Sequence, residues 1–185
     1  MKSGFGLLIG IGAVVLVILI IVGTFFGTYN SLVTKSQAID GQWAQVQTQY
    51  QRRFDLIPNL VTTVKRMLEQ EQLVFGQIAE ARSRIGVASA QLDEATSKYA
   101  AATTVNEKAV AGGQIEAGLG RLIAIWESYP ELRSVETVTQ LMDELAGTEN
   151  RISVERRRYN DFVRDYNTTI KKVPTNIIAS MFNFG

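Results

Sequence analysis

The chain has 185 residues and a formal net charge of +1, from 19 Lys and Arg against 18 Asp and Glu. It contains no Cys and no His, which excludes disulfides, thiolate nucleophiles, Cys/His zinc sites and Ser-His-Asp catalysis within it. A nucleic-acid-binding domain would need a larger positive excess. We therefore expect no nucleic-acid partner and no cofactor, and the informative features are those of architecture.

The first predicted element is a membrane-spanning helix at residues 5–28. Residues 3–34 contain no charged side chain, and about 22 apolar residues at 1.5 Å each cover a hydrocarbon core about 30 Å thick. A cleaved signal peptide is the competing interpretation. Its apolar stretch would be shorter, however, and residues 23–27 match a cleavage site poorly. We expect a retained anchor.

Large apolar side chains at both ends of the chain are the expected membrane contacts. Those at the end of the span fit the aromatic belt of a membrane–water interface. Those near the carboxyl end follow Lys171 and Lys172, which would point to headgroups while the apolar tail enters the interface. The alternative is that this tail packs as a lid on the end of a bundle. The expected membrane residues are Phe5, Leu16, Phe25, Phe26, Tyr29, Ile177, Ile178, Met181, Phe182 and Phe184.

The sequence says little about the orientation of the span or its pairing with other helices. Lys2 precedes it and Lys35 follows it, which slightly favours the amino end inside, but a long domain can override so small a bias. The glycines at positions 10, 12 and 23 do not have the G-x-x-x-G spacing of paired membrane helices. Orientation therefore stays open, and no helix pairing is inferred from these glycines.

Beyond the span, apolar residues recur at a seven-residue spacing that predicts long helices packed along coiled-coil-like seams. One set runs from Tyr50 to Ile85, and a companion set runs from Phe54 to Phe75. Because the pattern stays in phase across Pro58, we predict one long helix that is kinked there and does not end.

The rest of the chain predicts two more helices. Residues 85–105, rich in Ala, Ser and Thr, are expected to hold the end of the first helix and a turn. A shorter helix follows at residues 106–129, and a last one lies between Pro130 and Pro174. The apolar stripe of the last helix is Val138, Leu145, Ile152, Tyr159 and Tyr166, with Leu141 and Phe162 as companions.

These elements define an all-α fold, in which an N-terminal transmembrane helix continues into a long antiparallel bundle of three to four helices. The expected divisions are a short amino end at 1–4, the transmembrane helix at 5–28, the bundle at 29–173 and an apolar tail at 174–185. A bundle of so few helices has more than one apolar face, so packing against further copies of the chain is also expected.

Polar residues near the predicted kink and along the last helix are the candidates for a functional site. A catalytic site at the kink is conceivable, but we favour a salt-bridged cluster that fixes the register between helices. The residues of this register cluster are Arg52, Arg53, Asp55, Pro58, Asn59, Glu149, Asn150, Tyr159, Asn160, Tyr166 and Asn167.

Individual roles within the register cluster follow from residue type. Asp55 and Glu149 are too few carboxylates for a calcium cage, so no metal site is expected. The tyrosines are expected in the core, with hydroxyls bound to partners such as Asp55 or Asn59. The asparagines that follow each tyrosine are expected to make inter-helical hydrogen bonds.

Several short phrases are specific when taken together in their order and spacing. They are YNSLV at 29–33, RRFDLIPNLV at 52–61, ESYPEL at 127–132, ENRI at 149–152, RRRYN at 156–160 and DYN at 165–167. This ensemble resembles the bacterial LemA family over nearly the whole chain. The resemblance implies a single-pass membrane protein with a long helical bundle and no established enzymatic activity.

The resemblance also bears on attachment and role. Some family members carry a lipoprotein cysteine near the position of Gly27 and Thr28, so this chain has to rely on its membrane helix. Family descriptions place the short amino end outside, against the slight charge bias. A relative works in forming magnetosome membranes, which makes membrane shaping an analogy.

We therefore expect a non-enzymatic, self-associating structural protein that organises or shapes the bacterial plasma (inner) membrane. Its expected partners are the lipid bilayer, further copies of itself and other membrane proteins. The alternative is a membrane-tethered adaptor that binds another protein through the bundle.

Overall fold

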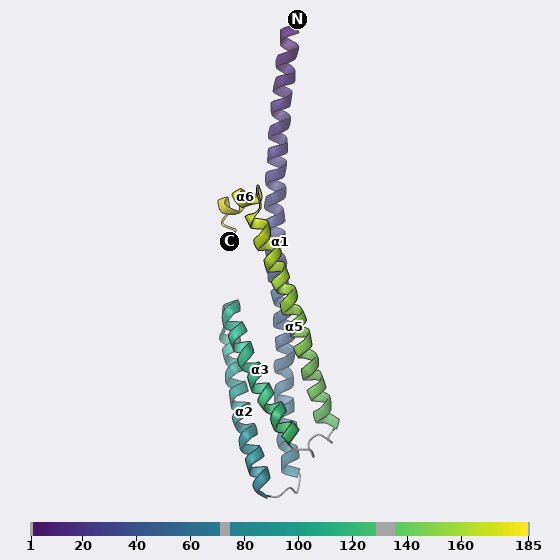
Figure 1. Ribbon diagram of the computed structural model, residues 1–185, viewed down its shortest axis with the longest axis vertical. Coiled ribbons are helices and arrows are strands. Elements are labelled where there is room, and N and C mark those ends of the chain that lie inside the picture. The colour runs from purple at the N-terminus through teal and green to yellow at the C-terminus, as the bar shows by residue number, and fades with distance from the viewer. Residues whose placement is uncertain (1, 71–74, 129–135, 185) are drawn as a thin grey trace. The chain divides into compact units, whose positions relative to one another are not determined.

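The computed structural model describes residues 2–70, 75–128 and 136–184, and every regular element among them is an α-helix (Figure 1). Side chains are described for residues 10–66, 79–128 and 136–184. The elements are α1 (Lys2–Gln70), α2 (Phe75–Ala101), α3 (Val105–Ser128), α5 (Glu136–Lys171) and α6 (Thr175–Met181). The predicted all-α class is confirmed.

The chain divides into two compact units, and α1 and α5 contribute to both. The anchor unit consists of Met1–Val46 and Val154–Gly185, and the bundle unit consists of Gln47–Ser153. Each unit holds its own buried contacts, so the two are described separately.

Helix α1 contains the span. Among the described residues, this is the one helix long and apolar enough to cross a membrane. Its side chains from Ile11 to Val22 are exposed, as expected for a segment whose neighbours are lipid. The same helix contains Pro58 and does not end there, as predicted, and the proline lies on its exposed side. The kink at Pro58 stays a prediction.

In the bundle unit, α1 buries one seam with alternating spacings of three and four residues, the pattern of a coiled-coil face. The seam consists of Tyr50, Arg53, Ile57, Leu60 and Val64. Four of its five members are apolar or aromatic, and the fifth is a cation.

The predicted single long helix is wrong beyond residue 70. Helix α1 ends at Gln70, and a separate helix, α2, begins at Phe75, so that Ile85 lies on α2. Figure 1 shows α2 running back beside α1, and the Tyr99 ring lies 5.0 Å from both the Tyr50 and the Phe54 rings.

The segment that the sequence predicted to be a helix end and turn forms most of α2. Its buried residues alternate small and large side chains at heptad spacing: Ala81, Ile85, Ala88, Leu92, Ala95 and Tyr99. Alanine has the highest helix propensity and leaves room for a neighbouring backbone. The alanines that made the segment look irregular are therefore the inner face of the helix.

Helix α3 matches the predicted helix at 106–129 to within one residue at each end. It begins with a capping box, in which the Glu107 carboxylate accepts from the backbone N–H of Thr103 (2.9 Å) and Thr104 (3.1 Å). The Thr104 hydroxyl accepts in turn from the Glu107 N–H. The backbone donors hold the pKa of the Glu107 carboxyl below its usual value.

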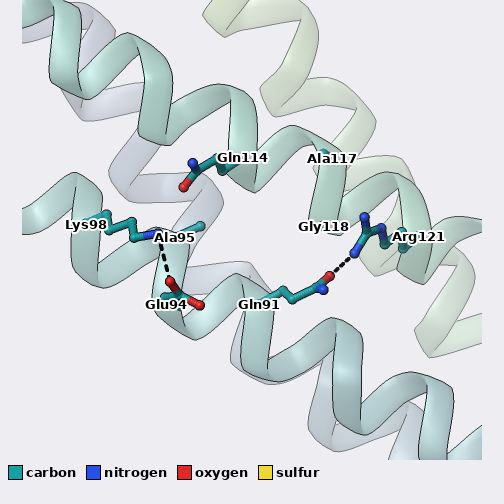
Figure 2. A pocket seen from close by; sticks show the side chains of 8 residues that line it. All are labelled: Gln91, Glu94, Ala95, Lys98, Gln114, Ala117, Gly118 and Arg121. Atoms are coloured by element: carbon teal, nitrogen blue, oxygen red, sulfur yellow. Dashed lines mark hydrogen bonds and ion pairs between the residues drawn. The ribbon is translucent and has the colours of Figure 1, made fainter.

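Glycines let α3 approach its neighbours closely. A Cβ at Gly118 would lie 2.8 Å from a Leu92 methyl of α2, and a Cβ at Gly112 would lie 2.7 Å from the Tyr50 hydroxyl of α1. On the rim of the α2–α3 contact, Arg121 donates to Gln91, as Figure 2 shows. Packing at glycine and alanine therefore holds the bundle unit together.

Helix α5 lies between Pro130 and Pro174 as predicted, but of its companion residues only Leu141 is half-buried, and Phe162 is wrong as a core residue. Phe162 is 44% exposed, whereas Met142 is 9% exposed. Its inner face in the bundle unit follows spacings of four and three residues, which brings Met142 and Glu149 to the core side. Phe162, three residues after Tyr159 of the apolar stripe, therefore lies outside the inner face of α5.

Candidate membrane-contact site

The membrane end of the anchor unit is a small apolar core that joins three helices. Ile178 and Ala179 of α6 are buried at 6% and 4% exposure, together with Leu32 of α1 and Tyr166 of α5. Figure 1 shows α6 folded beside α1 at the end of α5. The carboxyl tail is therefore a packed element of the protein.

Aromatic rings tie α6 to the last turns of the span. The Phe182 ring lies 5.9 Å from the Phe25 ring and 4.8 Å from the Tyr29 ring, and the Phe184 ring lies 5.7 Å from Tyr29. The arrangements are tilted or edge-on, as aromatic pairs prefer. Phe26, next to this cluster, is 59% exposed.

The opposite side of α6 is apolar and uncovered. Ile177 and Met181 are 56% and 65% exposed, and Val173 just before the helix is 78% exposed. Ile178 was predicted to face the membrane and is instead buried, because one residue of helix turns its side chain about 100° from that of Ile177. The tail thus has an inner face that packs as a lid and an outer face that faces away from the protein.

The other predicted membrane residues fall on the span itself. Leu16 is 59% exposed within the apolar run, and Phe25 and Tyr29 are half-buried in the aromatic cluster. Phe5 lies on α1 but its side chain is outside the described set.

Polar contacts connect α1 and α5 on the side of this apolar core that is further from the span. Lys35 forms an ion pair with Asp165, and the Gln42 amide donates to the Glu155 carboxylate at 2.6 Å. Between these two contacts on α5, the Tyr159 ring packs on Trp43 at 5.2 Å.

The predicted partners of the Tyr159 hydroxyl, Asp55 and Asn59, are wrong. Tyr159 lies in the anchor unit beside Trp43, where burial and then the charge of Asp40 raise the pKa of its hydroxyl. Tyr166 is buried as predicted, in the core with α6.

In the bundle unit, the structure joins two members of the register cluster. Arg53 is bound to the Glu149 carboxylate, with the Arg53 side chain 7% and the Glu149 side chain 46% exposed. Arg53 stands on the inner seam of α1, so its charge is largely removed from water. An ion pair between facing seams is the arrangement expected of a register contact.

The remaining members of the register cluster lie on the surface. Asp55 accepts from the Gln51 amide at 3.0 Å, and with Arg52 it lines a groove whose far wall is α5, at Gly147 and Thr148. Pro58, Asn59 and Asn150 are exposed. Within the described residues, no three carboxylates lie close enough to hold a metal ion.

The asparagines after the tyrosines differ from their prediction. Asn160 and Asn167 are exposed and line a shallow groove along α5, together with Arg164, Lys171 and Lys172. They follow a tyrosine that points inward, and the next residue on a helix cannot share its face. Their position is on the surface of α5.

The span carries a feature that the sequence reasoning missed. Gly27 stands four residues after Gly23, and a Cβ at either would meet nothing within 4 Å. Both glycines therefore share one open face of α1 with G-x-x-x-G spacing. The four-residue spacing is present in the sequence. The aromatic residues between the two glycines were interpreted as part of the aromatic belt at the membrane–water interface.

A charge-free candidate span, a helical bundle and a tail packed against the end of that span are the features of a membrane-associated helical-bundle protein. The LemA family model matches residues 42–185, and the chain belongs to the LemA family. The span itself precedes the matched residues.

Three relatives are magnetosome proteins. Magnetosome proteins MamQ 1 and MamQ 2 of Paramagnetospirillum magneticum are each 28% identical over 182 residues, covering 92% of this chain and 67% of the relative. Magnetosome protein MamQ of Magnetospirillum gryphiswaldense is 26% identical over the same coverage. None of these names states a catalytic activity, and family and relatives together indicate a membrane-associated, structural role.

Proposed function

We propose that this protein is a self-associating scaffold of the bacterial plasma membrane that organises or curves the bilayer in which it is anchored. It acts without catalysis, and its primary partner is the lipid. The observation that carries the proposal is the docking of α6 against the end of the span, which gives the anchor unit two separate membrane-contacting parts.

The physical route starts from the outer face of α6. An apolar helical face at an interface enters about 5–10 Å into the headgroup and acyl boundary. The Phe25, Tyr29 and Phe182 ring contacts hold α6 at the end of the span, so that it enters one leaflet only. When the area of one leaflet increases, the bilayer curves so that this leaflet is on the convex side.

Self-association would concentrate this effect. A membrane anchor confines the chains to two dimensions, which raises their effective concentration. The open face at Gly23 and Gly27 allows a second span to approach closely. The magnetosome proteins among its relatives support a role in membrane organisation and do not specify it.

Reconstitution into liposomes tests the proposal. At fixed protein-to-lipid ratio, cryo-electron microscopy should show smaller or tubulated vesicles with the native chain than without protein. An Ile177→Ser/Met181→Ser variant should lose most of this change, because it removes the apolar outer face of α6 and leaves the buried Ile178 in place. Vesicles that keep the protein-free diameter with native protein would contradict bilayer shaping.

A matched control uses exposed valines elsewhere. Val87 and Val110 of the bundle unit are 56% and 59% exposed, so a Val87→Ser/Val110→Ser variant loses apolar surface of the same kind at another place. It should shape vesicles as the native chain does. An equal loss in both variants would mean that α6 has no special part.

The second candidate is a membrane-tethered adaptor, favoured by the groove between α1 and α5 in the bundle unit, with Arg52, Asp55 and Arg151 on its walls. The mass of the particle in mild detergent separates the two candidates. A chain that stays monomeric as its concentration rises leaves the adaptor standing and refutes the self-associating scaffold.

A further inference from the structure

The charges nearest the membrane end of the anchor unit are of one sign. Residues 3–34 carry no charged side chain, and between residues 166 and 185 the charged side chains are Lys171 and Lys172 alone. Both are exposed. Any lipid headgroup that meets this end of the protein therefore meets two ammonium groups and no side-chain carboxylate.

The antiparallel register sets the height of these lysines. Asp165 pairs with Lys35, so Lys171, six residues further along α5, is level with Tyr29, six residues earlier on α1. Six residues of helix correspond to about 9 Å. Tyr29 belongs to the aromatic cluster at the end of the span, which places Lys171 in the headgroup layer when the span lies in the hydrocarbon core.

The nearest carboxylates are already engaged. Asp165 is held by Lys35, and Asp161 pairs with Arg164 at 3.2 Å. Asp40 lies on α1 about five residues beyond Lys35, further still from the span. Among the described residues, neither lysine forms an ion pair.

The surface beside the lysines suits phosphate oxygens. Lys171 and Lys172 line a shallow groove along α5 with Asn167, Thr168 and Arg164. The groove offers ammonium and amide donors, which bind phosphate. The apolar outer face of α6 begins within a few residues, at Val173 and Ile177, so one lipid can meet both surfaces.

We propose that Lys171 and Lys172 bind the phosphate of anionic phospholipid headgroups, so that α6 enters a leaflet preferentially where acidic lipid is present. This inference rests on the proposed function, because it uses the membrane contact of α6. It adds that the contact selects lipids by charge. A lysine at a membrane surface contributes roughly fivefold in preference for anionic lipid.

Because the chain contains no Cys, a donor fluorophore can be attached uniquely through Met181→Cys in the otherwise native full-length chain. The chain is reconstituted with phosphatidylcholine and phosphatidylglycerol, one of which carries an acceptor on its acyl chain. Energy transfer should be at least about fivefold more efficient per acceptor for phosphatidylglycerol, the preference that one of the two lysines would give alone. This ratio should fall with added salt because exposed charges are screened.

The Lys171→Gln/Lys172→Gln variant should bring the ratio to about one. The matched control, Arg156→Gln/Arg157→Gln, removes two exposed charges of α5 roughly 22 Å further from the membrane end and should keep the native ratio. An unchanged ratio in the lysine variant, or an equal fall in the control, would overturn the proposal.

A further arm separates the lipid surface from free phosphate. Inorganic phosphate should lower the energy-transfer ratio of phosphatidylglycerol to phosphatidylcholine no more than chloride does at the same ionic strength. The reason is that the lysines bind a headgroup that is part of the bilayer. Selective competition by inorganic phosphate would overturn the assignment to lipid.

Failure of this proposal can be told apart from failure of the proposed function. If the energy-transfer ratio is one but vesicles are still shaped, only the proposed selection of anionic lipid is refuted. A normal ratio with monomeric protein and unshaped vesicles would remove the scaffold and leave the lipid contact.

Discussion

Arg53 is the residue whose position is hardest to explain by packing alone. It occupies a seam position of α1 among Tyr50, Ile57 and Leu60, with only 7% of its side chain exposed. Its Nε has no hydrogen-bond partner among the described residues, so its stabilisation rests on the Glu149 carboxylate. Replacing such a pair by apolar residues is often neutral, whereas removing one partner leaves a buried charge.

We predict that Glu149→Gln lowers the free energy of unfolding by about 1–3 kcal/mol, because it removes the anion from a buried guanidinium. The half-exposed position of Glu149 keeps the loss below that of a fully buried pair. The double variant Arg53→Met/Glu149→Leu should recover most of this stability. Thermal unfolding followed by circular dichroism in mild detergent measures both effects.

Asp55→Asn provides the control for this ion pair. Asp55 is exposed and accepts a hydrogen bond from Gln51 of its own helix, so its replacement should change stability by less than about 0.5 kcal/mol. If Asp55→Asn and Glu149→Gln keep fold and assembly but abolish a cellular phenotype, the catalytic interpretation of these carboxylates would regain support.

Tyr99 gives a prediction that depends on pH. Its ring packs on Tyr50 and Phe54, and its buried hydroxyl has no hydrogen-bond partner among the described residues. Burial, and then the charge of Tyr50, raise the pKa of Tyr99 from 10.0 to about 12. The unfolded chain therefore ionises first, so that stability from this group is complete below pH 10 and is lost as the pH rises toward 12.

Tyr99→Phe should accordingly be neutral or stabilising by up to about 1 kcal/mol at neutral pH, because a buried hydroxyl without a partner disappears. It should also reduce the loss of thermal stability between pH 10 and 12. An alkaline loss identical in the native chain and the variant would mean that Tyr99 does not titrate differently in the folded state.

At the scale of elements, the sequence predicted the helices better than their ends. The heptad pattern from Tyr50 to Ile85 remained in phase across residues 71–74, and those residues contain no Gly or Pro to indicate a boundary. When two successive helices carry apolar residues in the same seven-residue register, the sequence pattern is the same as that of one long helix. Periodicity therefore established the existence of a seam and could not establish where the chain reverses.

Small residues explain the other errors. Ala81, Ala88 and Ala95 are buried on α2, but alanine adds little to an apolar pattern, so this face could not be seen in the sequence. The sequence predicted a polar cluster that contains both Arg53 and Glu149, but it did not predict which members pair; the structure joins these two. The grouping of Tyr159 with Asp55 failed because the register places Tyr159 beside Trp43.

Two neighbouring glycines on α3 test whether close packing sets the position of that helix. Gly112→Ala should lower the free energy of unfolding by about 1–3 kcal/mol, because its Cβ would lie 2.7 Å from the hydroxyl of the buried Tyr50. Gly113→Ala meets nothing within 4 Å and should raise stability by up to about 1 kcal/mol through helix propensity. Circular dichroism melting should give shifts of opposite sign, and equal shifts would show that Gly112 is not under packing constraint.

At the scale of the whole molecule, exposed apolar surface is unevenly distributed. The described part of the span and α6 expose long runs of large apolar side chains, whereas the described residues of the bundle unit expose only Val87, Val105 and Val110. The expectation that the bundle would keep a broad apolar face for packing against copies of itself is therefore not supported. Among the described residues, most large exposed apolar side chains lie on the predicted span and beside or on α6.

Under the scaffold proposal, this distribution favours self-association within the membrane. Lipid tails are as apolar as the span, so helices associate there through close packing at small residues. Gly23 and Gly27 supply such a face. We therefore predict that Gly23→Ile/Gly27→Ile shifts the full-length protein in mild detergent toward the monomer, with a dissociation constant at least about tenfold higher, corresponding to about 1.4 kcal/mol.

Gly10→Ile is the matched control for this variant. It also adds bulk at an open glycine of the span, but on a different face of the helix, so it should leave the mass distribution unchanged. Analytical ultracentrifugation over a concentration series measures all three proteins. An oligomer that survives Gly23→Ile/Gly27→Ile but dissociates when Ile177 and Met181 of α6 become serine would transfer the association from the span to the tail. A native chain that is monomeric throughout would leave the membrane anchor intact and remove self-association from the account, because no broad apolar surface on the described part of the bundle unit could replace it.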